Sequence, residues 1–422
     1  MSSSILTEPQ RISLVVVKMI TGSLSVLGSG LLIFNSIRKL RAQESTTYHR
    51  LLLGMSVIDV IHSVFAGTLV SVMVPPESGG WGALGNWQTC SFQGWAIQLS
   101  TAVPLYNASL SIYFLMTIRH QGKTPRSSFA GPGSNQAVKW TAIQIAEPLF
   151  HLVPWTVGLV TAFLALARGW YNPLVIPEVG CWVDHYPAGC VESAEDEIEC
   201  TRGISNAADL QRAVIMLSFW PLIAACSIVF VANVAIFVTV VIQERKLKNY
   251  GQSGNDSRSK EQIRTVAFQN FLYVLAMVNT VLWVLLADVA VYIGSIPPAT
   301  IYPLHLLYVL TFPMQGFWNF LVYIRRRYLR LRRVYSMPWR SAFYRATFPD
   351  GSELSSTRAV TKRNSAQSAK PDHNEASDDA HIEGGLAGAV TDGDDNAPTE
   401  SAASDPDQFF ESPSVMFLEE PL

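Results

Sequence analysis

The amino-acid sequence predicts an all-α membrane protein, a bundle of seven transmembrane helices with the amino terminus outside the cell. Three observations predict it: a low content of charged residues, repeated long apolar runs, and an uneven distribution of lysine and arginine between the connecting segments. Of the 422 residues, 49% are hydrophobic and 15% are charged, whereas about 25% of the residues of an average soluble domain are charged. The net charge of -2 says little, because it averages segregated acidic and basic segments.

Each predicted span is an apolar run that can cross about 30 Å of hydrocarbon, which takes about 20 helical residues. The first run is too long for the core of a signal peptide and lacks a basic leader, so we interpret it as a span. The fourth is interrupted near its start by Glu147 and Pro148, but 149–167 alone is nearly long enough. The seven runs are 12–37, 51–74, 92–118, 141–167, 213–242, 266–293 and 301–324.

Lysine and arginine in the short loops set the orientation of a membrane protein, because basic loops stay in the cytosol. One set of loops is basic, with clusters at 38–50, 119–139, 245–264 and 325–333. The opposite set offers only Arg11, Arg168, Arg202 and Arg212. With an odd number of spans, this places the amino terminus outside and the carboxy terminus in the cytosol.

The segment after the seventh span mixes arginines with aromatic residues from 325 to 344. This mixture is typical of an amphipathic helix that lies on the anionic inner leaflet. The alternative is a stop-transfer cluster, which would explain the arginines but not the aromatic residues. Beyond about Met337, small and polar residues dominate, and such a composition cannot offset the entropy of an ordered chain. We therefore expect an extracellular segment 1–11, a bundle with a juxtamembrane basic helix at 12–335, and a disordered cytosolic tail at 336–422.

Four of the five cysteines test this topology, because they fall on or beside the predicted outer face, where disulfides form. Cys190 and Cys200 are close together in one loop and are expected to pair, which leaves Cys90 at the outer end of the third span to pair with Cys181. The alternative is a set of free thiols. Cys226 lies inside the fifth span and is expected to serve packing only.

Ionisable residues inside a span are functional candidates, because their burial in hydrocarbon costs several kcal/mol. Asp59 lies in the middle of the second span, with His62 one turn further on the same face. Asp59 could hold a sodium ion or a water network that joins Asn35 and Asn319, or it could be a protonated structural aspartate. Lys18 lies near the end of its span, where snorkelling to the membrane interface explains it at least as well as a functional role.

Glu147 also lies near the end of its span, and the same two explanations, snorkelling and a functional role, apply to it. Ligand contacts are expected from the outer half of the sixth span and from the outer loop, where candidate residues are Trp283, Asp288, Tyr292 and Trp182. Trp283 would be an aromatic pivot below the cavity, although packing alone would also explain it. Pro313 in the seventh span removes a backbone hydrogen bond and creates a weak point, which a receptor or a transporter would use.

The seventh span ends with the run FPMQGFWNFLVY from Phe312 to Tyr323, followed directly by IRRRY. This segment resembles the cyclic-AMP-receptor-like group of G-protein-coupled receptors found in amoebae, fungi and other protists, and its Gln315-Gly316-Phe317 is similar to the secretin-type receptors. The likeness covers 12–335 and is supported by Asn35, by the stretch from Met55 to Asp59, and by Cys90 with the Cys181-Trp182 pair. The third span has no Asp-Arg-Tyr triplet and the seventh no Asn-Pro-x-x-Tyr, so a rhodopsin-class receptor is not expected.

The resemblance implies a plasma-membrane receptor for an extracellular small molecule or peptide, coupled to a heterotrimeric G protein and regulated through kinases or arrestin-type proteins at its tail. The bundle is expected to contact membrane lipids. No enzymatic activity, cofactor, metal ion or nucleic-acid partner is expected. The expected switch residues are Asn35, Asp59, His62, Pro313, Gln315 and Asn319. The expected G-protein contacts are Arg119, Lys123, Arg245, Lys246, Arg264 and Arg325.

A secondary transporter is the strongest alternative, with Asp59, His62 and Asp288 as an ion or proton path. Against it, seven spans do not divide into equal repeats, and no internal repeat is visible. A retinal protein would need a lysine in the seventh span, and 301–324 contains none. A zinc hydrolase would need clustered histidines, but the membrane histidines are predicted at different depths.

Overall fold

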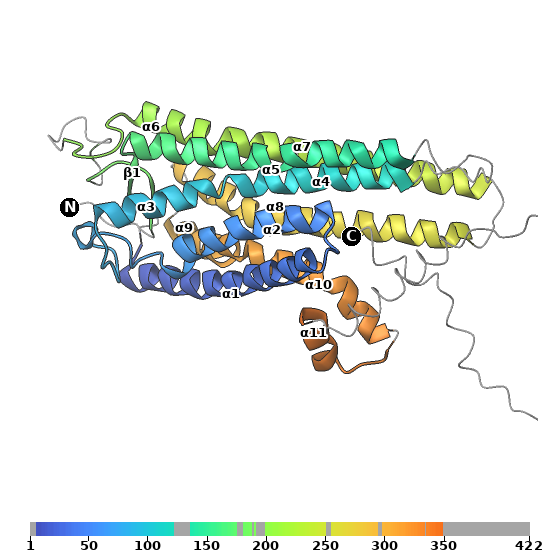
Figure 1. The fold of residues 1–422 in the computed structure, drawn as a ribbon. Helices are drawn as coiled ribbons and strands as arrows, with labels where there is room; N and C mark the ends of the chain where they lie inside the picture. Colours follow the sequence, from blue (N-terminus) through green and yellow to red (C-terminus); the bar gives the residue numbers. More distant parts are fainter. Residues whose placement is uncertain are drawn as a thin grey trace, which may run out of the picture. The chain divides into compact units, whose positions relative to one another are not determined.

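The computed structural model describes residues 6–121, 136–174, 180–187, 190, 199–249, 255–293, 298–333 and 335–348, which are almost entirely helical and form long neighbouring helices (Figure 1). The predicted spans correspond to α1 (Glu8–Arg41); α2 (Thr47–His62) with the π-helical η1 (Ser63–Thr68); α3 (Trp87–Leu99) with α4 (Ala102–Gln121); α5 (Gln136–Ala167); α6 (Ala207–Val214) with the π-helical η3 (Ile215–Phe219) and α7 (Trp220–Asn249); α8 (Asn255–Ile293); and α9 (Pro298–Thr311) with the 3-10 turn η4 (Phe312–Met314) and α10 (Gln315–Arg333). The remaining elements are η2 (Pro76–Ser78), β1 (Tyr171–Pro173), β2 (Cys181–Val183) and α11 (Trp339–Thr347).

The seventh predicted span consists of two α-helices, α9 and α10, with the 3-10 turn η4 between them. Within the described residues, six helical segments are long and apolar enough to cross a membrane, namely Glu8–Arg41, Thr47–Thr68, Trp87–Arg119, Ala142–Ala167, Ala207–Arg245 and Ile263–Ala287. The seventh consists of α9 with 14 residues, η4 with 3 and α10 with 19, and these follow one another without a gap. At about 1.5 Å per residue, the three pieces together exceed the thickness of the hydrocarbon layer.

Prolines inside the spans leave backbone carbonyls without a donor, since a proline cannot bond the carbonyl four residues before it. At Pro154, Pro221 and Pro313, a side chain from a neighbouring helix donates to that carbonyl instead. The three bonds run from Ser109 Oγ to Phe150 O at 3.3 Å, from Gln98 Nε2 to Leu217 O at 3.0 Å, and from Thr21 Oγ1 to Val309 O at 2.9 Å. The prolines therefore add contacts between helices, and α5 continues through both Pro148 and Pro154.

α1 packs backbone against backbone on η1 and α10 through glycines. A Cβ on Gly22 would lie 2.6 Å from Gly67 Cα, and a Cβ on Gly316 would lie 1.8 Å from Ser29 Oγ. The amide nitrogen of Gly316 donates to Ser25 Oγ at 3.1 Å. Any larger side chain at these glycines would force the helices apart, so α1, η1 and α10 form the tightest part of the bundle.

The spans differ in how much of their surface faces outward. Within α3 and α4, 72% of the most apolar stretch is buried, against 22% for the segment from α6 to α7. The outward face of α7 carries large apolar side chains such as Phe230 and Phe237, which are 71% and 70% exposed. Such a surface belongs in hydrocarbon rather than in water. α3 and α4 therefore lie inside the bundle, and α7 at its lipid-facing edge.

The outer loop contains a short antiparallel hairpin of β1 and β2, which the sequence did not predict. Both predicted disulfides are confirmed, Cys90 with Cys181 and Cys190 with Cys200. The ring of Tyr171 lies on Gly94 of α3, where a Cβ would be 2.5 Å from the ring, and its hydroxyl donates to Ala162 O at 2.9 Å. Burial raises the pKa of this hydroxyl well above its ordinary value. The hairpin is thus fastened to α3 and α5.

At the inner end, α11 lies inside the range 336–422 that was expected to be a disordered tail. Ala342 and Ala346 are buried in the same hydrophobic core as α10, and Phe343 lies edge-on to Phe320 with ring centroids 6.5 Å apart. Asn35 Nδ2 donates to the Thr347 carbonyl at 3.1 Å. α11 overlaps the amphipathic helix that the arginines and aromatic residues of 325–344 predicted, and it ends at Thr347, beyond that range. Residues 349–422 lie outside the described part.

Candidate functional site

A buried polar network joins α2, α8 and α10 in the middle of the bundle. Asn319 Nδ2 donates to Asp59 Oδ2 at 3.1 Å, and Gln315 Nε2 donates to Asn319 Oδ1 at 3.1 Å. Thr280 Oγ1 of α8 donates to Gln315 Oε1 at 2.7 Å. Gln315 and Asn319 share one face of α10 because they are four residues apart. Three of the predicted switch residues are thus linked, and Thr280, which the sequence did not single out, completes the connection to α8.

The other predicted switch residues lie around this network. Pro313 is buried directly above it, and its carbonyl accepts a hydrogen bond from Ser63 Oγ at 3.4 Å. The His62 ring meets Phe312 edge-on, with centroids 4.8 Å apart. The structure places the Asn35 amide at the carboxyl end of α11 rather than in the predicted link to Asp59, because the face of α1 that carries it turns toward α11.

A second polar cluster, the tyrosine cluster, joins the same three helices nearer the cytosol. It consists of Tyr48 on α2, Gln269 and Tyr273 on α8, and Tyr323 on α10. The hydroxyls of Tyr48 and Tyr273 are 2.7 Å apart, Gln269 Nε2 donates to Tyr48 Oη at 2.9 Å, and the rings of Tyr48 and Tyr323 stack at 6.5 Å. Tyr48 and Tyr273 are each only 1% exposed. The cluster therefore ties α8 to α2 and α10 at the inner end.

A neighbouring set of amides ties α8 to α4 and α7. Ser111 Oγ donates to Asn270 Oδ1 at 3.2 Å, and Asn270 Nδ2 donates to Asn233 Oδ1 at 2.8 Å. These residues were not among the predicted site residues. The available signal was the adjacent Gln269 and Asn270 within the apolar sixth run, since buried amides without partners are costly and indicate contacts with other helices.

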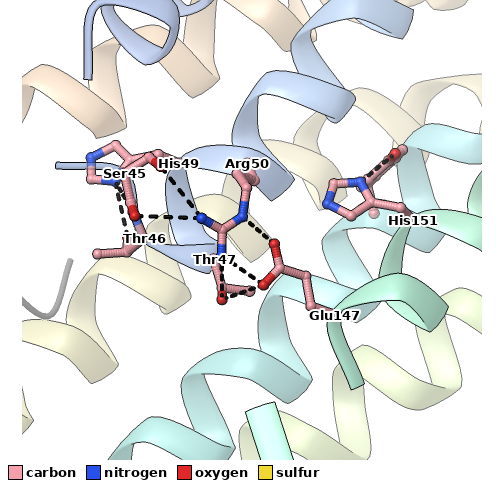
Figure 2. Close-up of polar contacts among 8 residues, drawn as sticks. Ser45, Thr46, Thr47, His49, Arg50, Glu147 and His151 are labelled. Carbon is pink, nitrogen blue, oxygen red and sulfur yellow. Dashed lines mark hydrogen bonds and ion pairs between the residues drawn. The ribbon is translucent and has the colours of Figure 1, made fainter. Parts of the chain in front are cut away.

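An ion pair between Arg50 and Glu147 joins the start of α2 to α5 (Figure 2). Arg50 Nη2 donates to Glu147 Oε2 at 2.7 Å, and Thr47 Oγ1 donates to the same oxygen at 2.8 Å. One turn along α5, His151 Nδ1 lies 3.0 Å from Tyr106 Oη. Snorkelling to the interface was one explanation of Glu147; in the structure the side chain is half-buried and bonded to α2, where an arginine compensates its charge.

The position of the Lys18 side chain also differs from the one expected for a snorkelling lysine. Lys18 is only 2% exposed, and its Nζ lies 5.3 Å from the centroid of the Tyr308 ring on α9. The face of α1 that carries Lys18 turns into the bundle, so the side chain points away from the lipid. Among the side chains that the structure describes, no three acidic, histidine or cysteine residues gather in a way that could hold a metal ion.

Two of the predicted ligand residues can be placed by their side chains. Trp182 of β2 is half-buried, and its Nε1 donates to Gln98 Oε1 at 2.9 Å. Trp283 of α8 is half-buried. Asp288 and Tyr292 belong to α8, but their side chains lie outside the described part. The two described residues come from different elements, β2 and α8, and their role as ligand contacts stays a prediction.

The predicted G-protein contacts lie at the inner ends of the helices. Arg119 and Arg245 are exposed, and Arg264 is exposed with its Nε 3.4 Å from Glu244 Oε1. The guanidinium of Arg325 lies 4.5 Å from the centroid of the Phe268 ring, which ties α10 to α8. Lys123 and the side chain of Lys246 lie outside the described residues.

No family model matches the chain, and no curated protein matches it in sequence. Among solved structures it is similar to the crystal structure of squid rhodopsin, with a TM-score of 0.53, 13% identity, and coverage of 80% of this chain and 91% of that chain. At this identity the likeness shows the fold alone. The chain shares the helical-bundle fold of squid rhodopsin and is a multi-pass membrane protein.

Proposed function

We propose that this protein is a plasma-membrane G-protein-coupled receptor that senses an extracellular ligand and activates a heterotrimeric G protein. The observation that carries the proposal is the double attachment of α8. Buried hydrogen bonds join it to α10 at Thr280 and to α2 at Tyr273 and Gln269. A helix held by a few exchangeable bonds at two depths is suited to transmit a displacement from the outer half of the bundle to its inner end.

The ligand would enter between the helices below the disulfide-bridged hairpin. Trp182, Trp283, Asp288 and Tyr292 are the proposed contacts. A ligand that displaces α8 near Trp283 would strain the hydrogen bond between Thr280 and Gln315, which lies one helical turn further in. Because Gln315 belongs to α10, the displacement would also reach α10. The break at η4 supports this step, because α9 and α10 meet there at a proline and the helix is weakest at that point.

At the inner end, an outward movement of α8 would separate Tyr273 and Gln269 from Tyr48. The exposed arginines of α4, α7 and α8 border the crevice that would open, and they would contact the G protein. Within the receptor class, the resemblance of the run from Phe312 to Tyr323 makes the cyclic-AMP-receptor-like group the proposed subtype. Kinases and arrestin-type proteins are the proposed regulators of 349–422.

The test is nucleotide exchange on purified heterotrimeric G proteins, catalysed by the full-length protein in lipid vesicles and screened against candidate ligands. Charge reversal at the inner face, by Arg119→Glu together with Arg245→Glu, should reduce exchange to the level of empty vesicles. Both residues are exposed, so the unfolding temperature should not change. Arg340→Glu reverses an exposed arginine charge on α11, away from the proposed contact surface, and serves as the matched control.

If the protein is instead a transporter that uses Asp59, His62 and Asp288, we expect solute uptake and no nucleotide exchange. Ligand-independent uptake of a solute into vesicles, without exchange on any G protein tested, would overturn the receptor proposal.

A further inference from the structure

Two buried glutamines of α3, Gln93 and Gln98, connect the outer hairpin to other spans. Gln93 is 0% exposed and Gln98 is 1% exposed. Gln93 Oε1 accepts a hydrogen bond from the amide nitrogen of Cys181 at 2.9 Å, and Gln98 Oε1 accepts one from Trp182 Nε1 at 2.9 Å. Two consecutive residues of β2 are thus each held by a different glutamine.

The nitrogen of each glutamine side chain bonds to a π-helical segment. Gln93 Nε2 donates to the carbonyls of Phe65 in η1 and of Val70 just after it, each at 2.8 Å. Gln98 Nε2 donates to Leu217 O in η3 at 3.0 Å. η1 and η3 are the two π-helical segments in the described part of the chain. Such segments are rare and occur often at functional sites.

The chemistry of the partners fixes the orientation of both amides. An indole N–H or a backbone N–H can only donate, and a backbone carbonyl can only accept, so each glutamine directs its oxygen to β2 and its nitrogen to a π-helix. Ser218 Oγ of η3 also donates to Gln98 Oε1, at 3.3 Å. Trp182 and η3 therefore meet at one buried amide.

The two connections differ in the part of β2 that they hold. Gln93 bonds to the backbone of Cys181, which its disulfide fixes to α3. Gln98 bonds to the side chain of Trp182, which is half-buried and packs on the hydrophobic cluster that contains Leu217. A side chain can rotate away from its partner while the strand stays in place. The Gln98 connection can therefore exchange, whereas the Gln93 connection is anchored.

η3 depends on the bond from Gln98. Pro221 has no N–H and cannot bond Leu217 O, the carbonyl four residues before it, so Gln98 Nε2 supplies a donor from another helix. A buried carbonyl that loses its donor destabilises the segment that carries it. Whatever turns the Gln98 amide therefore loosens η3, where α6 continues into α7.

We propose that Gln98 is a positioning residue through which Trp182 controls the conformation of η3 and the start of α7. When the Trp182 indole N–H bonds to another acceptor, Gln98 Oε1 loses the shorter of its two bonds, the amide can turn, and Leu217 O loses its donor. A ligand that carries a hydrogen-bond acceptor beside Trp182 would have this effect. The coupling is a property of the fold, and its use in signalling rests on the proposed receptor function.

Hydrogen–deuterium exchange of the full-length protein in detergent tests the coupling, because it measures local opening segment by segment. Trp182→Phe removes the indole N–H, and Gln98→Met removes the amide. Each should speed the exchange of the backbone amides in 215–222 about 3- to 10-fold. The double variant should exchange no faster than Gln98→Met alone, since both changes break the same connection.

Two further variants of α3 are matched controls. Trp95→Phe removes a buried indole N–H that has no hydrogen-bond partner among the described residues, so hydrogen exchange in 215–222 should stay unchanged. Gln93→Met removes the other glutamine and should speed hydrogen exchange in 65–70 but not in 215–222.

The proposal is overturned if Trp182→Phe exchanges no faster in 215–222 than Trp95→Phe, or if the effects of Trp182→Phe and Gln98→Met add. It is also overturned if Gln93→Met speeds exchange in 215–222 as much as Gln98→Met does. If Gln98→Met does not fold, the comparison of Trp182→Phe with Trp95→Phe still decides the question.

Nucleotide exchange on the G protein distinguishes failure of this proposal from failure of the receptor function. Loosening of η3 should raise basal nucleotide exchange about 3- to 10-fold in Trp182→Phe and leave it unchanged in Trp95→Phe. Unchanged basal exchange in Trp182→Phe of an active receptor would overturn the use of the coupling in signalling. A protein that shows the coupling by hydrogen exchange but activates no G protein retains the coupling and loses the receptor function.

Discussion

The outer and inner ends of the bundle are held together by different kinds of bond. At the outer end, Cys90–Cys181 joins α3 to the hairpin, and Arg202 both covers the Trp87 ring at 4.7 Å and donates to Asn172 Oδ1 at 3.1 Å. At the inner end, the described contacts among α2, α8 and α10 are hydrogen bonds, ring contacts and packing. The outer end is fixed covalently, and the inner end is fixed by bonds that can exchange.

The difference indicates where movement is possible. A hydrogen bond contributes about 1 kcal/mol net, so a ligand with a few kcal/mol of differential binding energy can shift an equilibrium in which several such bonds break. The same energy cannot open a disulfide. A receptor of this construction would keep its ligand entrance constant and change shape near the tyrosine cluster. Four predictions test this comparison.

The largest effect is expected at the outer end, from Cys90→Ser. The bridge spans a sequence separation of 91 residues, and its loss should lower the free energy of unfolding by about 3–5 kcal/mol, because the unfolded chain gains entropy. Thermal unfolding in detergent measures it. Cys226→Ser, at the free half-buried cysteine of α7, should cost less than about 1 kcal/mol. Equal losses in the two variants would show that the bridge does not hold the outer end.

The next effect is expected from the inner ion pair. Glu147→Gln or Arg50→Met leaves a partner uncompensated, and each should cost about 1–3 kcal/mol because the site is only partly buried. A double-mutant cycle on the unfolding midpoint separates the pair from its surroundings. A double variant that loses the sum of the two single effects would show that the pair contributes nothing of its own.

The tyrosine cluster should combine a small loss of stability with a gain in activity. Tyr48→Phe removes the hydroxyl that bonds both Tyr273 and Gln269, which destabilises the closed inner end by about 1–2 kcal/mol. If that end opens in the active state, basal nucleotide exchange should rise about 5- to 30-fold. Tyr344→Phe on the exposed face of α11 is the matched control. Unchanged basal nucleotide exchange in Tyr48→Phe would show that the tyrosine cluster does not control activation.

The smallest effect is expected at a proline-freed carbonyl. Thr21→Val removes the donor to Val309 O, which Pro313 cannot bond, and should cost about 1 kcal/mol. Thr239→Val is the matched control, since Thr239 Oγ1 donates only 2.7 Å away to Ala235 O of its own helix, a carbonyl that the helix already satisfies; it should cost less than about 0.5 kcal/mol. If both variants lose the same stability, the prolines do not create special contact points.

Much of the fold followed from the sequence. The spans and both disulfides were predicted correctly. The spans depend on a local property, apolar length, and the disulfides followed from the position of the cysteines relative to the predicted spans. The orientation, predicted from the basic loops, stays a prediction. The boundaries were less accurate. α11 overlaps the amphipathic helix predicted from 325–344, but it falls inside the range 336–422 that was assigned to the tail. Its contacts through Ala342, Ala346 and the Asn35 amide are with distant parts of the chain.

The candidate site followed from the sequence only in part. The positions of Asp59, Gln315 and Asn319 on two spans were readable, since a polar residue inside an apolar run is visible without a structure. Their bonding to Thr280 was not. The tyrosine cluster was missed altogether, because a tyrosine in a membrane helix is as often a packing or interfacial residue as a hydrogen-bonding one.

The sequence by itself determined that this protein crosses the membrane and where its loops are bridged, and it predicts which end faces outward. The tertiary structure alone decided which polar groups meet: snorkelling was one explanation of Lys18 and Glu147, and both point into the bundle. The physical reason is that a helix can rotate about its axis without changing its length or its apolar content. Its rotation is set by contacts such as Gly22 on Gly67, which arise only when the helices pack.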